Sequence, residues 1–144
     1  MVPAVVFFFG IMPALSFLGR WDSYLSFSLY SGNLDDCDIQ IDPADFARMP
    51  PAVRAATDPN SGAVDQTAWS NAELGAMPYP EHRIALNVGR SLARRARHGP
   101  VLVELDGKPN IRTGQIRSQY FCCPPGGGPP REISSDAYDK LSAP

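Results

Sequence analysis

The sequence is poor in the residues that build covalent frameworks and reactive centres. Its 144 residues include three cysteines and two histidines, and its formal net charge is −2. So few cysteines, in an odd number, exclude a disulfide framework. The absence of a basic excess argues against nucleic acid as the main partner. The length allows one domain with a hydrophobic core of ordinary size.

A long uncharged segment opens the chain. Val2–Gly19 is apolar apart from Ser16, and its length lies at the lower limit for a helix that spans a bilayer. Trp21 and Tyr24 follow, where aromatic side chains anchor a helix at the membrane interface. We therefore expect residues 1–20 to form a transmembrane helix and the protein to be located in a membrane, on a side that the flanking charges do not determine.

Two other interpretations of this segment stay open. Ala14-Leu15-Ser16 has the small-x-small form of a signal-peptide cleavage site. Cleavage near Ser16 would leave a small secreted binding domain, although no Lys or Arg precedes the apolar run as in a typical signal peptide. The third interpretation is a buried core helix.

Periodicity predicts an α+β domain over residues 21–123. Strict alternation of apolar and polar residues predicts strands at Leu25–Tyr30 and Cys37–Ile41, joined as a hairpin. A second hairpin is expected from Val101–Leu105 and Gln115–Phe121. The order β-β-α-α-β-β fits a small antiparallel sheet with helices on one face.

Helices are expected between the two hairpins. Asp42 followed by Pro43 is typical of a helix start, and Ser70–Glu73 fits a capping box that opens a short helix. The clearest helix is Pro80–Arg97, whose apolar residues recur every four positions. The predicted core consists of Leu25, Phe27, Leu29, Ile39, Ile41, Ile84, Val88, Leu92, Val101, Val103 and Leu105.

The end of the chain has low complexity. Pro124–Pro130 reads PPGGGPP, and a polar stretch follows it to residue 144. This composition predicts a linker and a disordered tail over residues 124–144.

Three stretches together resemble a known family. They are Leu18–Phe27 with the following LYSGN, Met77–Arg83 (MPYPEHR), and Leu105–Asn110 (LDGKPN) with Thr113-Gly114. The chain resembles, over Pro13 to Cys122, the C-terminal soluble portion of bacterial polytopic membrane proteins of the horizontally transferred transmembrane type. The resemblance implies a membrane location and no known reaction. It suggests a C-terminal piece of a larger multi-span protein, or a stand-alone descendant, with upstream membrane helices or another membrane subunit as partner.

The cysteines offer the most reactive side chains. Alternation lets only one of Cys122 and Cys123 face Cys37, and a Cys37–Cys122 disulfide is the candidate pairing. The three thiols with a histidine could bind zinc, but nothing in their spacing favours a site. A thiol-dependent redox or metal-binding module that uses Cys37, Cys122 and Cys123 is the alternative function.

A basic helix side is the second candidate surface. Arg90, Arg94 and Arg97 lie near the end of the predicted helix Pro80–Arg97, where they could contact anionic lipid headgroups. The acidic residues from Asp35 to Asp42 are better read as a solvated rim. Because we find no catalytic constellation, no cofactor-binding motif and no metal-ligand spacing, we expect a non-enzymatic domain.

Overall fold

The structure is a computed structural model that describes residue 7 and residues 36–79, 81–110 and 112–142. Its elements in chain order are β1 (Asp36–Gln40), the 3-10 helix η4 (Pro43–Arg48), α3 (Pro51–Ala55), β2 (Ala63–Val64), α4 (Gln66–Leu74), α5 (His82–Ala93), β3 (Val101–Asp106), β4 (Ser118–Cys123), β5 (Arg131–Ile133) and α6 (Ser135–Ser142). Within these ranges, no helix combines the length and apolar character needed to cross a bilayer. The predicted transmembrane helix, apart from residue 7, and the predicted strand Leu25–Tyr30 lie outside the described residues.

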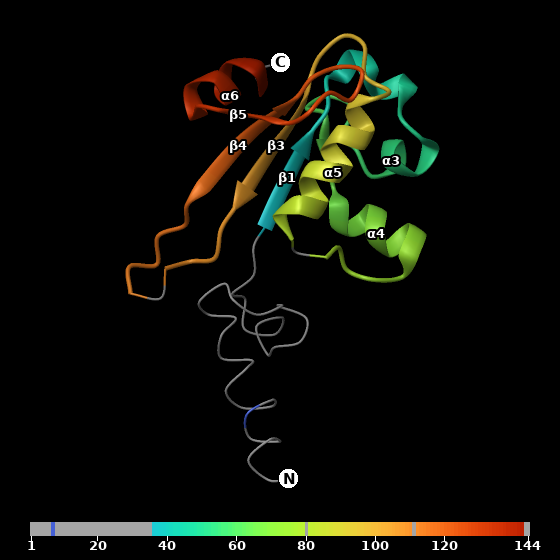
Figure 1. The fold of residues 1–144 in the computed structure, drawn as a ribbon. Helices are drawn as coiled ribbons and strands as arrows, with labels where there is room; N and C mark the ends of the chain where they lie inside the picture. The colour runs from blue at the N-terminus through green and yellow to red at the C-terminus, as the bar shows by residue number, and fades with distance from the viewer. Residues whose placement is uncertain (1–6, 8–35, 80, 111, 143–144) are drawn as a thin grey trace.

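The five strands form one antiparallel sheet in the order β2-β1-β3-β4-β5 (Figure 1). The pairing of β3 with β4 confirms the second predicted hairpin. Strand β1 confirms the strand that was expected at Cys37–Ile41, with each end one residue earlier. In the register, Ile39 lies opposite Val103, which lies opposite Phe121. These residues share one face, and their buried members begin the core.

Helix α5 packs against β3 through small residues. Its buried residues are Ala85, Gly89, Leu92 and Ala93. A Cβ atom built on Gly89 would lie 2.5 Å from Val103 Cγ2 and 3.3 Å from Cys123 Sγ, so only glycine lets the helix backbone lie this close to the sheet. Ile84 is 38 % exposed and Val88 is only partly buried. The helix was predicted, but its buried face is rotated about the helix axis. Ala85 and Gly89 face the core, in place of the expected Ile84 and Val88.

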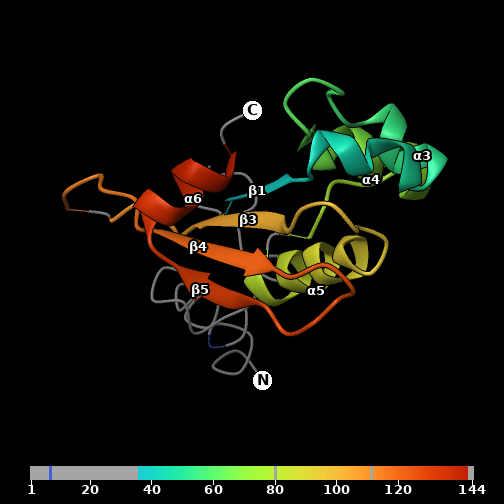
Figure 2. The same cartoon turned by 90° about the horizontal axis from the view of Figure 1, so that it is seen from above.

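Helix α6 covers the opposite face of the sheet (Figure 2). Tyr138 of α6 is 9 % exposed, and its ring centroid lies 4.8 Å from that of Tyr120 in β4. The expectation of helices on one face was therefore wrong, as was that of a disordered tail. The turn at residues 124–130 brings the chain back, β5 pairs with β4, and the apolar body of Tyr138 supplies the burial that composition did not reveal.

Of the two shorter helices expected before α5, one starts at the predicted residue and the other does not. Asp42 caps η4 as expected, because its side chain accepts a 2.8 Å hydrogen bond from Ala44 N–H, and η4 is a 3-10 helix. Helix α4 begins four residues before the predicted capping box. Asp65 is its N-cap and accepts a 2.8 Å bond from Ala68 N–H. Ser70 consequently lies inside the helix, where it caps nothing.

A buried carboxylate connects η4 to the segment that follows α5. Asp45 is 0 % exposed, and its Oδ2 accepts hydrogen bonds from the backbone N–H groups of Arg97 (2.9 Å), His98 (2.8 Å) and Gly99 (3.3 Å). Its Oδ1 lies 2.9 Å from His98 Nδ1 and 3.4 Å from Arg48 Nε. Burial alone would raise the pKa of Asp45, but these hydrogen bonds, led by those of His98, lower it to about 2.

Candidate functional site

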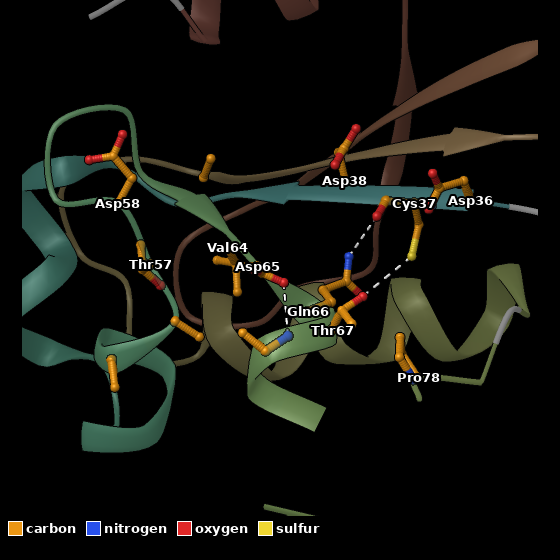
Figure 3. A pocket seen from close by; sticks show the side chains of 14 residues that line it. Asp36, Cys37, Asp38, Thr57, Asp58, Val64, Asp65, Gln66, Thr67 and Pro78 are labelled. Carbon is orange, nitrogen blue, oxygen red and sulfur yellow. Dashed lines mark hydrogen bonds between the residues drawn. The ribbon is translucent and has the colours of Figure 1, made fainter. Parts of the chain in front are cut away.

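The first half of β1 borders an open hollow of about 650 Å³ (Figure 3). Strand β2 pairs with β1 only at Ile39 and Gln40, which leaves the same side of β1 uncovered near Cys37. Gln66 of α4 occupies this position. Its Nε2 donates a 2.8 Å hydrogen bond to Cys37 O, and its Oε1 accepts a 3.3 Å hydrogen bond from Cys37 Sγ.

The hollow is acidic. Its charged lining residues are Asp36, Asp38, Asp58 and Asp65, with no Lys or Arg among the lining. Burial raises the pKa of Asp38, and the charges of Asp36 and Asp106 raise it further. Hydrogen bonds from Asn60 N–H and the Ser61 hydroxyl lower the pKa of Asp58. Such a surface repels anionic ligands. Over residues 36–79, 81–110 and 112–142, no group of three His, Cys, Asp or Glu side chains could hold a metal ion.

An apolar groove of about 390 Å³ adjoins this hollow, and both share Cys37, Gln66 and Pro78. It lies between α4 and α5. Its apolar lining consists of Trp69, Leu74, Met77, Pro78, Ile84, Ala85 and Val88. Leu74 is 76 % exposed and Met77 60 % exposed, which is unusual for side chains of this size gathered in one place. The groove is largely apolar, and sequence patterning missed it because Ile84 and Val88 looked like core residues.

The cysteines do not form the one candidate disulfide, Cys37–Cys122. The thiols of Cys37, Cys122 and Cys123 are all free. Cys37 lies opposite Leu105 and Cys122 lies opposite Leu102. Because side chains alternate between the two faces of a sheet, Cys37 and Cys122 lie on opposite faces, so the candidate Cys37–Cys122 disulfide was wrong.

The thiols are also poorly suited to nucleophilic chemistry. Burial raises the pKa of Cys37, and the charges of Asp36 and Asp38 raise it further. Burial likewise raises the pKa of Cys122 and that of Cys123, to about 11. A raised thiol pKa lowers the fraction of reactive thiolate at neutral pH.

The predicted basic side of α5 is partly covered. Arg90 Nε donates a 2.9 Å hydrogen bond to Gly127 O, and the Arg94 side chain lies against Gly127. A 2.8 Å bond from Gly126 N–H to Ala93 O holds the same turn against the helix. Of Arg90, Arg94 and Arg97, Arg90 is therefore a structural contact, whereas the other two side chains are exposed.

Sequence reasoning missed Asp45, the most deeply buried charged residue in the described ranges. It lies within a helix that was predicted, but its partners at residues 97–99 come from a distant segment. No local sequence pattern around Asp45 marks these distant donors. The contact of Asp45 with His98 resembles an acid–base pair, yet the carboxylate also binds three backbone N–H groups, so the arrangement is structural.

Comparison with protein-family models, with curated proteins and with solved structures finds no match for this chain.

Proposed function

We propose that this chain is a membrane-attached, non-enzymatic domain that binds an apolar segment of a partner in the groove between α4 and α5. The observation that carries the proposal is the groove itself, with Leu74 and Met77 exposed at its edge. Covering these side chains would remove apolar surface from water, which is favourable by about 25 cal/mol per Å². The partner in this proposal is an upstream membrane helix or another membrane subunit.

Trp69 lines the groove. Its indole Nε1 is buried and has no acceptor among the described residues. A buried donor without an acceptor costs free energy, so a bound segment whose carbonyl oxygen reached this atom after a side-chain shift would be favoured.

Membrane attachment is supported by the uncharged run Val2–Gly19 in the sequence. A non-enzymatic role is supported by the surroundings of the two kinds of described side chain with the most reactive groups, the buried carboxylate and the thiols. Asp45 is engaged by backbone donors, and the cysteine thiols have raised pKa values. The thiol-dependent alternative loses the clustering of Cys37, Cys122 and Cys123 on which it depended.

Membrane attachment is tested by fractionation of bacteria that express the full chain. We expect the chain to sediment with membranes and to resist carbonate extraction, because Val2–Gly19 inserts. The matched variant Phe8→Lys/Ile11→Lys should be extracted, because two charges in the run oppose insertion. A wild-type chain that is soluble without detergent would refute attachment, and a mature N-terminus near Ser16 would support the secreted alternative.

The groove is tested by a photoreactive amino acid placed at Leu74 in membranes. We expect a covalent adduct whose peptide map contains an apolar segment of another membrane protein. The matched control carries the same group at Glu132 on β5, which is exposed and lies outside the groove. Equal adducts at both positions, an adduct within residues 36–142 of the same chain or a dimer of this chain would each contradict the proposed partner.

A further inference from the structure

The loop that joins β3 to β4 carries charge of one sign. Residues 107–117 include Lys108, Arg112 and Arg117 and no Asp or Glu. The side chains of Arg112 and Arg117 are exposed, and neither forms an ion pair with a described carboxylate. Ile116, beside Arg117, is 53 % exposed. The loop therefore combines positive charge with an exposed apolar side chain.

Hydrogen bonds give this loop a defined shape. Asn110 Oδ1 accepts bonds from Arg112 N–H (2.9 Å) and Thr113 N–H (3.2 Å), and Asn110 O accepts a 2.7 Å bond from Gly114 N–H. Gly107 N–H donates a 3.0 Å bond to Arg117 O at the base of the loop. Because the backbone is held in this way, the cationic side chains are presented from a preorganised support.

The loop lies at the end of the sheet where the preceding chain enters. Asp36, the first residue of β1, lies opposite Asp106, and Asp106 lies opposite Ser118. The loop therefore starts one strand away from the entry point and projects beyond the sheet (Figure 1). Residues 20–35 separate the apolar run from Asp36, a span of at most about 55–60 Å when fully extended.

We propose that the β3–β4 loop is a second membrane contact, in which Arg112 and Arg117 bind anionic lipid headgroups and Ile116 enters the interface. This inference rests on the proposed membrane attachment. Each cation close to an anionic leaflet strengthens binding severalfold, and an apolar side chain beside the cations adds hydrophobic burial. Asp36 and Asp106 at the base of the loop are repelled by the same lipids, so the contact is made by the exposed side chains of Arg112, Ile116 and Arg117.

This surface replaces the one that the sequence suggested. Arg94 and Arg97 follow the C-terminal end of α5, at the other end of that helix (Figure 1), and the Arg94 side chain lies against Gly127 of the turn at residues 124–130. The β3–β4 loop lies at the end where Asp36 enters. The proposed loop contact requires this end of the sheet to face the bilayer, which directs Arg94 and Arg97 away from it.

Backbone hydrogen exchange of the full chain, with added vesicles, tests the loop. The vesicles contain phosphatidylcholine alone or phosphatidylcholine with phosphatidylserine. We expect exchange over residues 112–117 to slow by about fivefold or more on the anionic vesicles only, and the effect to disappear in 1 M NaCl because salt screens it. Arg112→Gln/Arg117→Gln should abolish the slowing, and the matched control Arg94→Gln/Arg97→Gln should retain it.

The outcomes separate the two proposals. Equal exchange on both vesicles with a chain that stays bound overturns the loop contact and leaves attachment intact. If hydrogen exchange in the loop slows on anionic vesicles but the chain does not bind neutral vesicles, the loop contact is supported and the apolar anchor is contradicted. Slowing by inorganic phosphate in the absence of lipid identifies a free-anion site and overturns the lipid assignment. Slowing that persists in the Arg112→Gln/Arg117→Gln variant overturns the lipid assignment as well.

Discussion

The Asp45 carboxylate lies 2.9 Å from the Nδ1 atom of His98, fifty-three positions later in the chain. This contact connects η4 to the segment between α5 and β3, and it holds a charge with 0 % exposure. We expect Asp45→Asn to destabilise the full chain by about 3 kcal/mol, because three backbone donors lose a charged acceptor. Urea unfolding in mild detergent, followed by tryptophan fluorescence, measures this change.

A matched control is Asp42→Asn, at the N-cap of the same helix. Asparagine caps helices about as well as aspartate, so we expect a change below about 0.5 kcal/mol. Similar losses for both variants would show that Asp45 contributes no more than an ordinary cap.

The same carboxylate predicts a loss of stability in acid. Its pKa falls from 3.8 in the unfolded chain to about 2 in the folded chain. The ionised form therefore stabilises the fold by about 2 kcal/mol above pH 4, and this contribution disappears as the pH falls toward 2. The difference in unfolding free energy between wild type and Asp45→Asn should shrink over that range, and a constant difference would refute the shift.

Gly89 sets the distance between α5 and the sheet. We expect Gly89→Ala to destabilise the fold by about 1–3 kcal/mol, because the new Cβ atom would lie 2.5 Å from Val103 Cγ2. Ser91→Ala, at an exposed site on the same helix, should change stability by less than about 0.5 kcal/mol. In a Val103→Ala background the cost of Gly89→Ala should fall, and an unchanged cost would place the strain elsewhere.

The two adjacent cysteines should differ in reactivity. Cys123 is 0 % exposed and its pKa is raised to about 11, whereas Cys122 is only partly buried on the other face. In a thiol titration at pH 8, Cys122 should react before Cys123, which should react on unfolding. Cys123→Ser should leave the fast phase unchanged; loss of that phase would reverse the assignment.

Tyr138 should bind the end of the chain to the sheet. We expect Tyr138→Ala to lower stability by about 3 kcal/mol, because it removes a buried ring that contacts Tyr120. Lys140→Ala, on the exposed side of α6, serves as the control. Equal unfolding midpoints for wild type and Tyr138→Ala would indicate that residues 135–142 are disordered, as their composition predicted.

Short-range patterns predicted β1, β3, β4 and the long helix because each reflects its own periodicity, whereas β2 and β5 were not predicted. Alternation located β1, and the apolar run located β3. The rotation of α5 could not be predicted, because the burial of Gly89 depends on the close approach of Val103 from another element. The same holds for Asp45, whose donors at residues 97–99 lie far away in the sequence.

For residues 124–144, the composition led to a wrong prediction. Low complexity at Pro124–Pro130 predicted disorder, yet this turn bonds to Ala93 through Gly126 and leads into β5. The candidate groove was equally hidden, because exposure of Leu74 and Met77 is a property of the packed helices. Composition reports only the residues within a segment, whereas the burial of that segment is determined by its contacts with other segments.

The way Gln66 bonds to Cys37 also bears on aggregation. Strand edges with free backbone groups recruit other chains, and β2 covers β1 over two residues only. Cys37 O is occupied by the Gln66 amide and Cys37 N–H by the Asp36 carboxylate, so the exposed stretch offers no continuous ladder to an incoming strand. The opposite edge, β5, is three residues long and carries Arg131 and Glu132. Side-chain hydrogen bonds thus protect the uncovered part of β1 against strand addition, whereas short length and charged side chains protect β5.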